Sequence, residues 1–157
     1  MSVSVSTRRL LLAGCGAAAF ALAGCETVDE TVNEVVGNAF SATLTGGSEV
    51  PGPGDPDGWG RARVTINDAA NTICTDLEVR DIGDVTAAHI HQGGAGVAGP
   101  PVVTLDSPDD DDSDDCDTKD DALVDAIRNN PGAFYVNVHT VAHPDGAIRG
   151  QLAEHHD

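Results

Sequence analysis

The stretch Arg61–Asn67 reads RARVTIN, and it decides the class of fold predicted for this chain. Successive side chains of a β-strand point to opposite faces, so the alternation places three apolar residues on one face: Ala62, Val64 and Ile66. The stretch Ile73–Arg80 repeats the pattern, with Ile73, Leu77 and Val79 expected inward and Cys74, Asp76 and Glu78 outward. Both stretches are therefore predicted to be strands with one buried face.

Similar short runs, separated by Gly, Pro, Asn and Asp, continue through the chain from Asn38. This arrangement is typical of an all-β antiparallel sandwich. Further strands are predicted at residues 40–45, 85–91, 102–105, 133–140 and 147–152, and the segment His143–Gly146 is a predicted turn between the last two. One short helix is expected, with Thr118 as its N-cap and Asn129–Gly132 as its end.

The first 24 residues have the features of a signal peptide. Arg8 and Arg9 precede the uncharged stretch Leu10–Ala23, which leads into Leu22-Ala23-Gly24-Cys25, the pattern of a lipobox. Small residues let the signal peptidase approach the backbone, and the thiol of Cys25 is the group that receives the diacylglycerol. The sequence thus predicts a lipoprotein anchored on the extracytoplasmic side of a membrane, at the cell surface or in the periplasm.

Two other interpretations of this end of the chain are weaker. Cys15 follows a similar local pattern, but an apolar segment ending there would be too short. A transmembrane anchor would need about 20 apolar residues, more than the stretch provides. The context Ser6–Leu10 is similar to a twin-arginine signal, which leaves the export route open between that system and Sec. Residues 25–37 are predicted to be a tether, with a short helix as the alternative.

Cys74 and Cys116 are the thiols that remain if Cys15 is removed with the signal peptide and Cys25 is acylated. An exported protein meets an oxidising environment, so an internal disulfide between them is predicted.

The chain is strongly acidic, with a formal charge of −18 and a pI near 4.2. Loss of Arg8 and Arg9 with the signal peptide leaves 6 basic against 26 acidic residues, a net charge near −20. Nucleic acid is excluded as a partner, because binding it requires neutralisation of phosphate by Lys and Arg. Self-repulsion favours a soluble monomer.

The run Asp106–Asp121 contains ten aspartates in sixteen residues. It lacks the ligand spacing and the turn glycine of an EF-hand, so nothing in it specifies a calcium cage. A solvated acidic loop held by Cys116 is predicted instead.

The tripeptide His89-Ile90-His91 is the strongest candidate for chemistry. In a strand its two imidazoles lie on one face, about 6.6 Å apart, and can converge on one metal ion. His139 lies in another predicted strand, and the three imidazoles meet if those strands are neighbours. Such a set suits copper or zinc, and His143 could add a fourth ligand. The alternative is that these imidazoles only bond to the carbonyls of the glycine-rich loop at residues 93–101.

His155 and His156 lie in a tail, residues 154–157, that is expected to be frayed. No arrangement of Ser, His and Asp forms a catalytic triad, and no cysteine is left to act as a nucleophile. The residues therefore favour a binding or structural module over an enzyme.

Three ordered blocks resemble the CHRD (chordin) domain family: residues 40–51, 89–105 and 135–152. The resemblance assigns residues 38–153 to one such domain and implies an immunoglobulin-like Greek-key β-sandwich with a limited likeness to copper-zinc superoxide dismutases. It also implies copper-ligand positions for His89, His91 and His139. The histidine-rich zinc loop of those enzymes has no counterpart here. Gly52 and Pro101 depart from the family pattern in loops.

Two functions follow as hypotheses. The first is a lipid-anchored module that binds an extracellular protein or polymer without catalysis. The alternative is a copper-binding protein with redox or dismutase-like chemistry through the three histidines. Convergence of those histidines around an open coordination position would favour the second.

Overall fold

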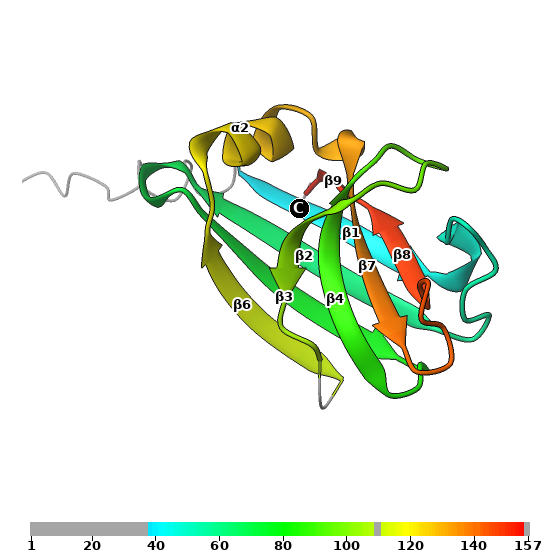
Figure 1. Ribbon diagram of the computed structural model, residues 1–157. Coiled ribbons are helices and arrows are strands. Elements are labelled where there is room, and N and C mark those ends of the chain that lie inside the picture. Colours follow the sequence, from blue (N-terminus) through cyan, green and yellow to red (C-terminus); the bar gives the residue numbers. More distant parts are fainter. Residues whose placement is uncertain (1–37, 109–110, 156–157) are drawn as a thin grey trace, which may run out of the picture.

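The computed structural model describes residues 38–108 and 111–155. Within them, nine strands and one α-helix are arranged as in Figure 1. The strands are β1 (Ala39–Thr45), β2 (Trp59–Asn67), β3 (Thr72–Arg80), β4 (Val85–Gln92), β5 (Pro101–Leu105), β6 (Asp112–Thr118), β7 (Phe134–Thr140), β8 (Ile148–Gln151) and β9 (Ala153–Glu154). The helix is α2 (Asp121–Asn129), and single 3-10 turns cover Gly46–Ser48, Asp68–Ala70 and Pro131–Ala133.

The strands form one antiparallel sheet in the order β5-β4-β7-β8-β1-β2-β3-β6, with β9 added beside β1. The sheet curls until it is nearly a closed barrel, with β5 and β6 as its two edges. The all-β, antiparallel prediction is therefore confirmed. The two layers expected of the sandwich are joined in one ladder, because Thr45 of β1 pairs with Arg149 of β8.

The interior holds the apolar face of β1, β2, β3, β4, β5, β7 and β8. β2 and β3 alternate as their sequences predict, with Val64 and Leu77 buried and Arg63 and Asp76 exposed. The helix α2 lies over one end of the barrel (Figure 1), where Val124 and Ile127 join the same core. All strands predicted from the sequence are present, with ends that differ by at most two residues.

The N-cap of the helix differs from the prediction. Asp120 is the cap, and its side chain accepts a hydrogen bond of 2.9 Å from the backbone N–H of Leu123. Thr118 is unavailable for this role because it is the last residue of β6 and pairs with Thr72. The helix ends at Asn129, one residue before Asn130 and the following Pro131.

The acidic run is only partly a loop, because Asp112–Thr118 is the strand β6 on the edge of the sheet. It pairs with β3 in a register that sets Cys116 opposite Cys74, and these two cysteines form the predicted disulfide. No residue of β6 is buried, so its sequence lacks the apolar alternation that reveals a strand. Its negative charge also suits an edge, because it discourages pairing with a second chain.

The chain end is held more firmly than expected. Ala153 and Glu154 form β9, and the N–H of His155 donates to the carbonyl of Ala39 at 3.0 Å. His156 lies outside the described residues, as do the predicted signal peptide, Cys25 and the tether. Among the residues described, no helix has the length and apolar character needed to cross a bilayer.

Candidate metal centre

The outward side of β4, β7 and β8 carries a layer of polar side chains that are buried or half-buried. Alternation along β7 turns Val136 and Val138 into the core and places Tyr135, Asn137 and His139 on the outer side. We call this surface the covered face; its members are His89, His91, Tyr135, Asn137, His139, Arg149 and Gln151. Loops cover it, and the loop before β2 lies beside β8 in Figure 1.

The three predicted histidines meet on the covered face. β4 and β7 are neighbours, and the register pairs His89 with Asn137 and Ala87 with His139, which sets His89 and His139 on a diagonal. The ring centroid of His89 lies 5.4 Å from that of His91 and 5.3 Å from that of His139. One nitrogen of each ring lies within 4.8 Å of the other two. The strands that carry the histidines are therefore neighbours, and the three imidazoles meet as the sequence analysis required.

Hydrogen bonds fix which nitrogens face the cluster. Nδ1 of His91 donates to the carbonyl of Gly99 at 2.8 Å, and Nδ1 of His139 donates to that of Pro144 at 3.0 Å. A carbonyl only accepts, so both Nδ1 atoms carry the proton, and in the neutral form of each ring the lone pair is then on Nε2. These Nε2 atoms and Nδ1 of His89 are buried and have no hydrogen-bond partner within the described part of the chain.

The protonation state also suits metal binding. Burial lowers the pKa of His89, and repulsion from His139 and His91 lowers it further. Burial likewise lowers the pKa of His91; the bond to Gly99 opposes this shift, and repulsion from His139 and Arg149 adds to it. Both rings are therefore neutral at pH 7, the form in which imidazole binds a metal.

The donor set fits copper or zinc. Three imidazole nitrogens match the preference of both metals for nitrogen ligands, and three protein ligands leave a coordination position open. Among the residues described, no other His, Cys, Asp or Glu joins this group. The prediction that His143 adds a fourth ligand finds no support. His143 lies in the turn between β7 and β8, outside this group, and its Nε2 is 3.7 Å from the carboxylate of Asp55.

The glycine-rich loop is fastened over His91 by side chains of the covered face. The hydroxyl of Tyr135 bonds both the carbonyl and the N–H of Gly99, and Arg149 donates to the carbonyls of Gly94 and Val97 at 3.0 Å. A Cβ added to Gly99 would lie 1.7 Å from the backbone oxygen of Gln92. Glycine is therefore required where this loop approaches β4 most closely.

Sequence reasoning missed a buried acidic residue beside the cluster. Glu49, in the loop after β1, is 7% exposed, and its carboxylate accepts a hydrogen bond from the side chain of Asn137. Burial raises the pKa of Glu49 to about 7, although attraction to Arg149 and two hydrogen bonds oppose the rise. The alternation of β7 places Asn137 on the covered face, but no local pattern identifies Glu49 as its partner.

The topology and the three histidines can now be compared with known proteins. No curated protein and no solved structure matches the chain. One family model does match: that of the CHRD domain, over residues 40–152, which include every strand of the path from β1 to β8 except the first residue of β1. Because this match spans most of the sequence, the chain belongs to the CHRD domain family.

Proposed function

We propose that this CHRD domain binds a transition-metal ion, copper or zinc, through His89, His91 and His139. One observation carries the proposal: three buried imidazole nitrogens, which have no hydrogen-bond partner among the described residues, lie within 4.8 Å of one another. A buried polar atom without a partner costs about 1–3 kcal/mol. A bound ion would remove that cost at all three nitrogens, whereas hydrogen bonding to loop carbonyls satisfies only the opposite nitrogens of His91 and His139.

The open coordination position supports a second candidate function, redox or dismutase-like chemistry at bound copper. The proposed Greek-key sandwich of the family agrees with this candidate. The Greek-key topology is supported by two connections, β3–β4 and β5–β6. Each of them passes between the β5-β4-β7-β8 half and the β1-β2-β3-β6 half of the sheet.

The test of metal binding is calorimetric titration of the metal-free full chain with Cu(II) and with Zn(II). Two variants accompany it: one with His89→Ala and His91→Ala, and one with His143→Ala. We expect one ion per chain for the wild type and for His143→Ala, and loss of that tight site in the double variant. Because the surface is acidic, weak binding that persists in all three proteins would refute the proposal.

We also infer that the protein is exported and anchored in a membrane through a lipid on Cys25. The disulfide between Cys74 and Cys116 supports an oxidising compartment. Anchored there, the domain would be placed to meet an extracellular protein or polymer. Expression of Cys25→Ser should release the protein from the membrane fraction. Equal membrane association of both proteins would contradict the inference.

A further inference from the structure

A buried cation, Arg149, reaches the histidine cluster through one aromatic ring. Arg149 is 2% exposed, and its guanidinium carbon lies 3.4 Å from the centroid of the Tyr135 ring. That ring is stacked on the imidazole of His91, with 4.8 Å between centroids and 12° between planes. The cation, the phenol and the proposed ligand thus form a continuous stack on the covered face.

The charge of Arg149 is poorly balanced. Its Nη2 donates to two loop carbonyls, while its Nη1 is buried and has no partner in the described residues. No carboxylate among those residues lies within ion-pair distance of it. The acidic group that attracts it is Glu49, and burial raises the pKa of Glu49 to about 7. At neutral pH this carboxyl is therefore only partly charged.

The proposed ligands do not neutralise a bound ion. His89, His91 and His139 are neutral donors, and within the described residues no thiolate or carboxylate completes the group. The full charge of an ion would then remain in a partly dehydrated site near Arg149. Repulsion from Arg149 grows with the charge of the ion, and the desolvation cost grows faster still. A monovalent ion is consequently penalised much less than a divalent one.

Among the ions that imidazole binds well, copper is available in a monovalent state. Copper(I) also accepts a low coordination number, which three imidazoles can supply. We propose that Arg149 is a specificity-determining residue that makes the cluster of His89, His91 and His139 favour copper(I) over copper(II) and zinc(II). This inference rests on the proposed metal binding and specifies the metal and its oxidation state.

The test compares the affinities of the full chain for copper(I) and copper(II). Copper(I) is measured without oxygen by competition with bicinchoninate, copper(II) by competition with nitrilotriacetate, and zinc(II) by calorimetry. We expect copper(I) to bind at least 100-fold more tightly than copper(II). That ratio corresponds to a potential about 120 mV above that of the free couple. Binding of copper(II) or zinc(II) that is equally tight would overturn the inference.

Charge variants test the role of Arg149 itself. Arg149→Gln should lower the ratio of copper(I) to copper(II) affinity about tenfold, whereas Arg149→Lys should keep it. Glu49→Gln removes the opposing negative charge while retaining an acceptor for Asn137, so at pH 8 it should raise the ratio. Circular dichroism checks folding, and the Glu49 variant suffices if Arg149→Gln does not fold.

The outcomes separate this inference from the proposed function. Loss of every form of binding in the wild type removes both. Histidine-dependent binding with a ratio that neither Glu49→Gln nor Arg149→Gln changes removes only the role of Arg149. A ratio that shifts in opposite directions in these two variants supports it, because a merely structural effect would not follow the sign of the removed charge.

Discussion

The covered face and the outward side of β2, β3 and β6 belong to the same sheet but differ in how their polar side chains are satisfied. We call the second surface the open face; its members are Arg61, Arg63, Asp76, Glu78, Arg80, Asp112 and Asp114. Behind the covered face, and behind β2 and β3 of the open face, the inward residues are mostly apolar. The difference therefore arises outside the sheet, where loops cover one surface and solvent reaches the other.

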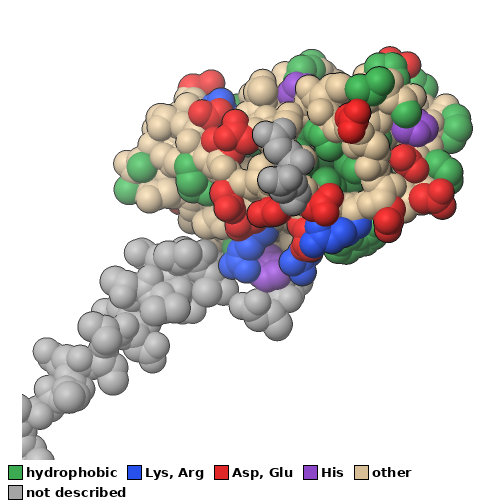
Figure 2. Space-filling model, turned by 90° about the horizontal axis from the view of Figure 1, so that it is seen from below, with side chains coloured by type: hydrophobic (Ala, Val, Ile, Leu, Met, Phe, Trp, Pro, Cys, Tyr) green, Lys and Arg blue, Asp and Glu red, His purple; other side chains and the backbone are tan. Residues whose placement is uncertain are grey.

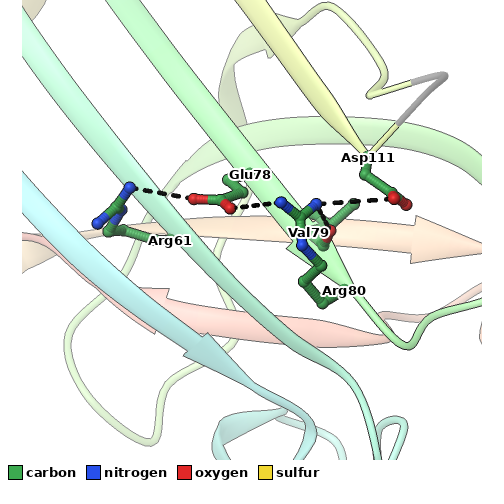
Figure 3. Close-up of polar contacts among 5 residues, drawn as sticks. All are labelled: Arg61, Glu78, Val79, Arg80 and Asp111. Carbon is green, nitrogen blue, oxygen red and sulfur yellow. Dashed lines mark hydrogen bonds and ion pairs between the residues drawn. The ribbon is translucent and has the colours of Figure 1, made fainter.

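The open face holds a hollow of about 580 Å³ and three arginines in an otherwise acidic molecule. Figure 2 shows Asp and Glu side chains over much of the view, with a small group of Lys and Arg side chains together. In Figure 3, Glu78 lies between Arg61 and Arg80, and Arg80 also approaches Asp111. The arginine side chains of Arg61 and Arg80 are 66% and 47% exposed.

This comparison shows why the smaller, covered site is the better functional candidate. On the open face Glu78 pairs with Arg61 and Arg80, and the exposed charges there can be solvated by water, so they do not need a ligand. On the covered face, three imidazole nitrogens and one guanidinium nitrogen are buried without partners in the described residues. Unsatisfied buried groups indicate a ligand more strongly than the size of a hollow does.

The largest expected effect on the free energy of unfolding comes from removing the disulfide at the edge of the open face. Replacing both Cys74 and Cys116 by serine should lower the free energy of unfolding by about 4 kcal/mol, because the bridge closes a loop with a sequence separation of 42. β6 buries no side chain, so it is held by this bridge and by its backbone ladder with β3. Urea denaturation measures the change. A loss below about 1 kcal/mol would mean that the β3–β6 ladder alone holds this edge.

The next effect concerns the buried acid of the covered face. The folded state raises the pKa of Glu49 from 4.5 to about 7, so folding favours the protonated form. The stability it contributes is complete below pH 4.5 and is lost as the pH rises through 7. Between these limits the free energy of unfolding of the wild type, relative to Glu49→Gln, should fall by about 3 kcal/mol.

Denaturation of the two proteins at matched pH values isolates this effect, because their other titrating groups are the same. A difference between wild type and Glu49→Gln that stays constant from pH 4.5 to 8 would refute the expected burial of the Glu49 charge.

A smaller effect tests the cover itself. Gly99→Ala should lower the free energy of unfolding by about 2 kcal/mol, because the new methyl group clashes with the backbone of Gln92. It should also weaken metal binding, since Gly99 accepts the hydrogen bond that orients His91. Gly94→Ala is the matched control: no atom of the described residues lies within 4 Å of its added Cβ, so neither property should change. Equal effects of both substitutions would contradict the close approach.

The sequence predicted the elements whose side chains alternate between core and surface. β2 and β3 follow this rule, and so does the pair His89 and His91 on β4. β6 was missed because neither of its faces is buried, which removes the only periodic signal a strand has. The N-cap was assigned to Thr118 because local spacing cannot tell that β6 already uses this residue.

The candidate site was predictable only in part, because alternation within a strand reveals some of its residues but not the contacts between distant segments. A spacing of two residues brings His89 and His91 together, and neighbouring strands add His139. His143 fails as a ligand because its turn directs it to Asp55. Asn137 and Arg149 are partners in the β7–β8 ladder, but Glu49, which is distant in sequence, joins them only because a loop folds back over the sheet. Periodicity within a strand carries no information about such a meeting.

The smallest expected effect lies on the open face. Arg61→Ala removes one of the two arginines that pair with Glu78, at 3.0 Å, and leaves the bond from Arg80 at 2.6 Å. The Arg61 side chain is 66% exposed, so water replaces the lost contact and the free energy of unfolding should fall by less than about 0.5 kcal/mol. Even this change should vanish in about 1 M salt, where screening acts within a few ångströms. Urea denaturation at low and high salt measures it, with metal affinity as a second readout that should stay unchanged. A loss above about 1 kcal/mol that persists in salt would mean that the open face, like the covered one, depends on specific polar contacts.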